Sequence, residues 1–214
     1  MHIPDSFIPI WQGAIYWIIV LVFITLALKW AKDEMNEEKL PLVAVLAAGI
    51  FALQSFNLPV SMGTSGHLVG GALAAIILGS PFAAVFILAM VLIVQGVLFG
   101  DGGITVMGAN IINMGVIGGF VGFYTFKGLM GMTKSMPLSV FFAAWLACLI
   151  PALAASLELY LAGTFPLVEG MIAMGIYYAI IGVIEGIVTV GAIYLITTAR
   201  PDLVDTGAKT ATGA

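Results

Sequence analysis

The residues with the most distinctive chemistry stand at the start of the chain, Met1 and His2. A free α-amine followed by histidine is a chelator, because the amine, the His2 amide nitrogen and the His2 imidazole close five- and six-membered rings around one metal ion. Only one other histidine occurs, His67, and its imidazole would complete a square of four nitrogens. Such sites suit Ni(II) or Cu(II) and accommodate Co(II). This pattern predicts a metal site, although histidine also occurs at position 2 by chance and His67 could simply form a hydrogen bond.

The predicted chelate requires that the chain keep its own N-terminus. No positively charged n-region precedes the first apolar run and no A-x-A cleavage site follows it, so we expect Met1 to be retained. Amide coordination requires loss of a proton, so metal binding should weaken at low pH. The one cysteine, Cys148, lies in a hydrophobic run, which excludes a disulfide framework and a CxxC metal site.

Several polar residues lie where they could support this site. The loop Phe99–Gly103 carries Asp101 among glycines, and an aspartate there could orient a histidine or simply cap a turn. Polar amides on apolar helices usually face the bundle interior, where they either support a site or tie helices together. The candidates for supporting contacts are Ser65, Gln95, Asp101 and Asn110.

Two acidic residues, Glu158 and Glu185, fall within hydrophobic runs and have no obvious basic partner. An ionisable group inside a membrane is a functional hypothesis by default. Because we place the metal site at the outer surface, we do not assign either residue to it. Both could be protonated structural residues or could contact a partner subunit.

The composition is that of an all-α integral membrane protein, with 62% hydrophobic and 8% charged residues. Long apolar runs predict a bundle of seven transmembrane helices, and the short third run begins in a Gly-rich stretch. We expect one domain over residues 1–200 and a short cytoplasmic tail over 201–214. The seven predicted spans are 8–30, 41–57, 67–79, 82–99, 105–126, 137–162 and 171–198.

The distribution of basic residues predicts how the bundle is oriented. With seven spans, all Lys and Arg residues fall on one face, and the opposite face has none. The positive-inside rule then places the C-terminus in the cytoplasm and both histidines outside. The basic residues are Lys29, Lys32, Lys39, Lys127, Lys134, Arg200 and Lys209.

Three stretches resemble the CbiM/NikM family, the substrate-capture (S) components of energy-coupling-factor transporters for cobalt and nickel. They are Met1–Pro9, Pro59–Leu68 and Gln95–Gly103, and the resemblance extends over essentially the whole chain. It implies a seven-helix fold whose ligands are the Met1 amine, the His2 amide and imidazole, and the His67 imidazole. The loop that carries Asp101 matches one that closes over the family's site. Ser6 departs from this pattern, because the family has glycine there.

The resemblance implies a multi-pass cell-membrane component of an ATP-driven importer that binds Ni(II) or Co(II) at the outer face. The implied partners are a transmembrane coupling (T) component, two ABC-type ATPases and often a small accessory membrane subunit. We expect no enzymatic activity and no cofactor besides the transported metal, because the sequence contains no P-loop, HExxH or Ser-His-Asp pattern. The alternatives are a membrane-embedded metal-dependent enzyme and a stand-alone divalent-metal carrier.

Overall fold

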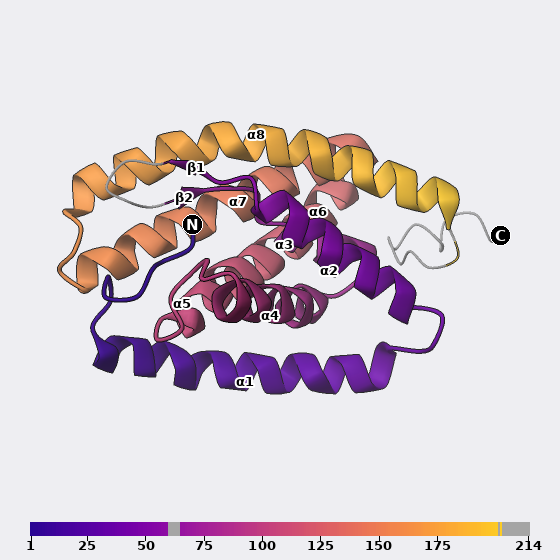
Figure 1. The fold of residues 1–214 in the computed structure, drawn as a ribbon. Helices are drawn as coiled ribbons and strands as arrows, with labels where there is room; N and C mark the ends of the chain where they lie inside the picture. The colour runs from indigo at the N-terminus through magenta and orange to yellow at the C-terminus, as the bar shows by residue number, and fades with distance from the viewer. Residues whose placement is uncertain (60–64, 201, 203–214) are drawn as a thin grey trace.

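The computed structural model describes residues 1–59, 65–200 and 202, which form a helical bundle with one two-residue antiparallel strand pair (Figure 1). The bundle contains both long helices and short connecting ones. In chain order the elements are α1 (Ile10–Glu34), α2 (Leu40–Gln54), β1 (Leu58–Pro59), β2 (Ser65–Gly66), α3 (Gly71–Ile77), α4 (Pro81–Leu98), α5 (Met107–Ile111), the π-helix η2 (Ile112–Ile117), α6 (Gly118–Thr133), α7 (Met136–Leu161) and α8 (Leu167–Ala199).

Helices form at all seven places where apolar runs predict spans. Five are long and apolar enough to cross a membrane: α1, α4, the continuous α5–η2–α6 segment, α7 and α8. The other two are shorter, since α2 has 15 residues and α3 has seven. At 1.5 Å per residue α3 rises only about 10 Å, against a hydrocarbon core of about 30 Å. The predicted span over 67–79 is therefore wrong in extent, and the count of seven membrane crossings stays a prediction.

The backbone explains why the third helix is short. Residues 67–70 precede α3 outside any helix, and Gly70 has a φ of 79°, in the left-handed region that glycine tolerates. A Cβ on Gly70 would lie 2.8 Å from the Ile50 side chain, so the close packing also requires glycine. After α3, the Ser80 hydroxyl caps α4 by accepting from the Phe82 N–H at 3.2 Å. His67 therefore lies in the irregular segment that leads into α3.

Small residues bring α3 into the centre of the bundle. All seven residues of α3 are buried, among α4, α6, α7 and α8. A Cβ on Gly71 would lie 2.8 Å from the Met114 carbonyl oxygen, and one on Gly122 would lie 2.7 Å from Ala72. These glycines let backbones approach closely within the chain, which is how small residues commonly act in membrane helices.

The ends of the helices fall into two groups. In Figure 1 the end of α1, the start of α2 and the end of α8 lie at one end of the bundle, and the α7–α8 connection lies at the other. Consistent with this, the start of α2 and the end of α8 line one shared pocket, which includes Arg200. The basic residues around the connection between α1 and α2 thus lie at the same end of the bundle as Arg200. Lys209 lies outside the described residues, as does the predicted tail over 201–214 except for residue 202.

Candidate metal site

The first three residues of the chain fold back into the bundle. Met1, His2 and Ile3 are only 1%, 4% and 1% exposed. The Asn110 side chain of α5 holds them, because its Oδ1 accepts from the Ile3 N–H at 2.8 Å and its Nδ2 donates to the Ile3 carbonyl at 3.1 Å. The Gly103 N–H donates to the same carbonyl at 2.9 Å. Asn110 thus contacts the backbone of the N-terminal segment.

The turn after these residues is tied to the loop between α4 and α5. Asp5 Oδ1 accepts from the Thr105 N–H at 2.9 Å and from the Thr105 hydroxyl at 2.5 Å. A Cβ on Gly103 would collide with the Asp5 backbone nitrogen, so the loop needs glycine there. Ser6 has a φ of 74°, a conformation that glycine adopts more easily. The glycine that the resemblance implies at this position therefore has a conformational reason.

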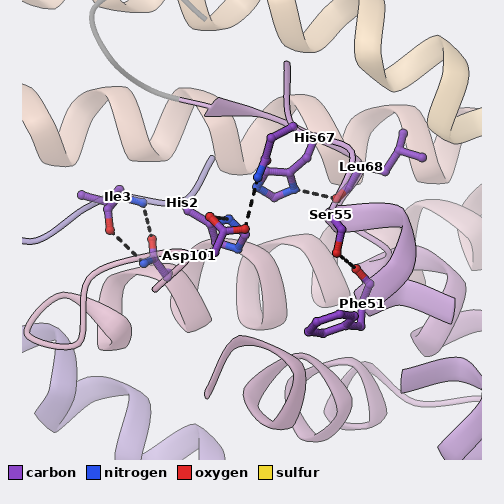
Figure 2. Close-up of polar contacts among 9 residues, drawn as sticks. His2, Ile3, Phe51, Ser55, His67, Leu68 and Asp101 are labelled. Carbon is purple, nitrogen blue, oxygen red and sulfur yellow. Dashed lines mark hydrogen bonds and ion pairs between the residues drawn. The ribbon is translucent and has the colours of Figure 1, made fainter. Parts of the chain in front are cut away.

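The His2 imidazole lies between two other candidate residues (Figure 2). It stacks on the His67 ring, with 4.3 Å between ring centroids and 23° between planes. Its Nδ1 lies 3.0 Å from Asp101 Oδ1. The other oxygen of Asp101 accepts from Asn57 Nδ2 at 3.2 Å. The Gln95 side chain also lies beside His2.

The orientation of the His67 ring leaves one nitrogen available. His67 Nδ1 lies 2.7 Å from the Leu68 carbonyl oxygen, and since a carbonyl only accepts, Nδ1 carries the proton. The Nε2 lone pair is buried without a hydrogen-bond partner among the described residues. The Ser65 side chain and residues 60–64 fall outside the described part, so the supporting role of Ser65 stays a prediction.

Burial makes the three candidate ligand groups neutral. It lowers the pKa of the Met1 amine from 8.0 to about 4. It also lowers the pKa of the His2 imidazole, although the hydrogen bond to Asp101 opposes this effect. Burial, together with the charges of the amine and of His2, holds the pKa of His67 well below its usual range. The influence of these charges on one another shows that the amine and both rings are close together. A metal ion requires its nitrogen ligands to be neutral.

The donor set is fit for a metal that prefers nitrogen. Across residues 1–59, 65–200 and 202, no three His, Cys, Asp or Glu side chains form a metal-binding group. The nitrogens of the N-terminus and two imidazoles remain as the donors, and His67 Nε2 is buried without a hydrogen-bond partner among the described residues. Carboxylate-rich sites for Mg(II) or Ca(II) do not match this set.

The site lies deeper in the bundle than the sequence indicates. The Tyr178 hydroxyl hydrogen-bonds to the backbone of His67. Tyr178 follows Leu167, the first residue of α8, by 11 residues, which is about 16 Å along the helix axis. His67 itself is 1% exposed. The site is thus buried within the bundle, because the N-terminal segment and residues 67–70 both enter it, and its place at the outer face of the membrane stays a prediction.

Sequence reasoning did not connect Glu185 to this site. Its Oε2 accepts from the Val69 N–H at 2.8 Å, and its Oε1 accepts from the Gly70 N–H at 2.8 Å. Gln54 Nε2 in turn donates to the Val69 carbonyl at 2.7 Å. The signal that Glu185 could be functional was its place inside a hydrophobic span without a basic partner. The sequence did not indicate which backbone groups it contacts.

Glu158 belongs to a different cluster. Its Oε2 accepts from Asn113 Nδ2 at 2.7 Å, and its backbone carbonyl accepts from Gln12 Nε2 at 3.0 Å. Gln12 also donates to the Tyr16 hydroxyl at 2.8 Å. This cluster joins α1, η2 and α7, and none of these hydrogen bonds involves a candidate metal ligand.

The known proteins that this chain resembles are described by metal uptake or metal transport. A family model described as "Cobalt uptake substrate-specific transmembrane region" matches residues 2–203. A protein of Haloquadratum walsbyi named for metal transport is 38% identical over 208 residues, covering 96% of this chain and 94% of that protein. A protein of Archaeoglobus fulgidus named as a fused nickel transport protein is 35% identical over 208 residues, covering 96% of this chain and 68% of that protein.

The fold is also similar to a solved structure. A crystal structure described as a truncated transition metal transporter superposes with a TM-score of 0.88 at 29% sequence identity. The match covers 93% of this chain and 99% of that one. The similarity therefore extends over nearly the whole length of both chains.

Proposed function

Because the chain belongs to the CbiM family of cobalt uptake substrate-specific transmembrane proteins, we propose that it captures Ni(II) or Co(II) through Met1, His2 and His67. The family is a transporter family and not an enzyme family. The chain is a multi-pass membrane protein and a cobalt or nickel transport component of a metal uptake system. The proposal therefore concerns the residues that bind the ion and the partner subunits that drive its import.

One observation carries the proposal: two stacked imidazoles, of which His67 has a buried Nε2 without a hydrogen-bond partner among the described residues, lie beside a buried N-terminal amine. In the proposed site the Met1 amine, the His2 amide nitrogen, His2 Nδ1 and His67 Nε2 form a square around the ion. Four nitrogens in a plane suit Ni(II) and accommodate Co(II). The metal is the cargo of the protein, and the same ligands serve both ions.

Asp101 has a defined part in this scheme. Only His2 Nδ1 can close a six-membered ring with the His2 amide nitrogen, and in the structure this atom lies 3.0 Å from the Asp101 carboxylate. Metal binding therefore exchanges the contact with Asp101 for a bond to the ion. The proton on Nδ1 moves to Nε2 through solvent or a neighbour, and the imidazole stays neutral. Asp101 holds the ring near the amine until this exchange.

We further propose that import is driven by partner subunits. The chain contains no nucleotide-binding motif, so ATP hydrolysis is assigned to two ABC-type ATPases acting through a transmembrane coupling component, with a small accessory membrane subunit. The basic residues around the α1–α2 connection and Arg200 share one end of the bundle, which favours an orientation with that end in the cytoplasm. A reporter fused after Ala214 should then be cytoplasmic, and a reporter signal outside the cell would contradict this orientation.

The direct test is metal content. Purified protein should hold one Ni(II) or Co(II) per chain by elemental analysis. One residue added before Met1 should abolish stoichiometric binding, because it converts the amine into an amide and lengthens the buried segment. His67→Ala should also abolish stoichiometric binding, leaving only the weaker binding of the remaining three nitrogens. One residue added after Ala214 is the matched control and should leave the stoichiometry unchanged. Full metal content in the N-terminally extended protein would refute the proposed ligand set.

A further inference from the structure

The segment that carries His67 is held along one face of α8. Tyr178 contacts the His67 backbone, and Glu185 accepts from the N–H groups of Val69 and Gly70. Tyr178 and Glu185 are seven residues apart, so they lie on the same helix face about 10.5 Å apart along its axis. Three residues of extended chain, from His67 to Gly70, span about 10 Å. The spacing of the two side chains thus matches the length of the segment that they hold.

Glu185 provides the stronger of the two attachments. Its two carboxylate oxygens accept one backbone N–H each, both at 2.8 Å, and the residue is 2% exposed. A third donor, the Cys148 thiol, also hydrogen-bonds to Glu185. No Lys or Arg forms an ion pair with it among the described residues.

The position of the His67 Nε2 depends on this backbone. The ring is fixed relative to its own segment because Nδ1 bonds to the next residue's carbonyl, that of Leu68. Where Nε2 lies relative to His2 is therefore decided by where the segment is anchored. Gln54 holds the Val69 carbonyl from the α2 side. Burying an acidic side chain inside the membrane costs free energy, and an apolar residue could fill the same space at a lower cost.

We propose that Glu185 is the positioning residue for His67: by holding the Val69 and Gly70 N–H groups it places the fourth nitrogen of the metal site. This rests on the proposed function, since it assumes that His67 is a ligand. Glu185 does not touch the ion. It acts through the backbone of the segment that His67 belongs to, from about the middle of α8.

The experiment compares Ni(II) affinity and the visible absorption spectrum of bound Ni(II) in six purified full-length proteins. These are the unaltered chain, Glu185→Gln, Glu185→Ala, His67→Ala, Glu185→Ala combined with His67→Ala, and Glu158→Gln. Glu158 is the matched control, because it is the other buried acid and bonds to Asn113. Loss of an orienting contact around a metal ligand typically costs 10- to 100-fold in affinity.

We expect Glu185→Ala to weaken Ni(II) binding 10- to 100-fold and to shift the spectrum to that of the His67→Ala protein. Glu185→Gln keeps one acceptor oxygen and the same shape, so it should fall between Glu185→Ala and the unaltered chain. Adding Glu185→Ala to His67→Ala should cause no further loss, since both act through one ligand. Glu158→Gln should keep the original affinity and spectrum.

Two failures are distinguishable. If the unaltered chain binds no Ni(II), the proposed function itself is wrong. If it binds Ni(II) and Glu185→Gln and Glu185→Ala both keep the original affinity and spectrum, only the positioning role is refuted. A loss in Glu185→Ala that adds fully to that of His67→Ala would likewise refute it, because the two residues would then act separately.

Discussion

Metal binding should release about one proton per ion at pH 7, because burial has already removed the others. Coordination of the His2 amide nitrogen releases one proton in any case. The Met1 amine, with its pKa lowered from 8.0 to about 4, has no proton left to lose at this pH. The lowered pKa values of His2 and His67 leave both imidazoles neutral as well.

An exposed version of the same ligands behaves differently. At pH 7 an amine with a pKa of 8.0 is about 90% protonated, and each imidazole with a pKa of 6.5 is about 25% protonated. An unstructured chelate would therefore release more than two protons per ion. Relative to an exposed amine, the buried one gains roughly tenfold in apparent affinity at pH 7 and roughly 1,000-fold at pH 5.

Isothermal titration of Ni(II) in buffers of different ionisation enthalpy measures the protons released. The exposed control is a peptide of the first three residues, Met1–Ile3, titrated in buffer without histidine. It should release about two protons per ion. Between pH 6 and 8 the logarithm of the affinity of the whole protein should rise by about one per pH unit. A release of two or more protons by the whole protein would show that the amine is protonated, and would refute the argument from burial.

The same pKa shift makes a prediction for stability. The unfolded chain protonates this amine below pH 8.0, whereas the folded chain does so only near pH 4. The contribution of this amine to the free energy of unfolding is therefore complete above pH 8, and it is lost as the pH falls toward 4. From this amine alone, the free energy of unfolding should decrease by roughly 2–3 kcal/mol between pH 7 and pH 5. A thermal midpoint that is unchanged over this range in detergent would contradict it.

Three substitutions test the N-terminal segment. Ser6→Gly should raise the stability by about 1 kcal/mol, seen as a higher thermal midpoint, because it removes a non-glycine residue at a φ of 74°; Ser6→Ala should not. Gly103→Ala should weaken Ni(II) binding at least roughly tenfold by displacing Asp5, whereas Gly128→Ala, with no atom near its Cβ, should leave binding unchanged. Asn110→Leu should leave a buried backbone N–H unpaired and cost roughly 1–3 kcal/mol in thermal unfolding. Unchanged midpoints in Ser6→Gly and Asn110→Leu, or unchanged affinity in Gly103→Ala, would contradict this account of the segment.

The sequence predicted the helical fold well where hydrophobic runs were long. Every predicted span contains a helix, because an apolar run of about 20 residues in a membrane satisfies its backbone only as a helix. It failed at residues 67–79, where a left-handed Gly70 and close packing around Gly71 allow a short buried helix. Hydropathy alone cannot separate a span from such a helix, since both are apolar.

The sequence indicated candidate residues of the site but not how they pack together. A chelating start of the chain could be proposed from Met1 and His2 because the proposed chelate lies within one pair of bonded residues. The stack of His2 on His67 joins residues 65 positions apart, and the contact of His2 with Asp101 joins residues still further apart. Such contacts depend on how helices pack, and packing leaves no local pattern.

By itself the sequence determined that this is a polytopic helical membrane protein with two histidines, one of them at position 2. Those properties follow from composition and covalent neighbours. Only the tertiary structure decided that the amine and both imidazoles are buried together, that Asp101 holds His2 through Nδ1, and that Glu185 holds the segment of His67. Burial is what lowers the pKa of the amine, and burial is a property of the whole packed bundle.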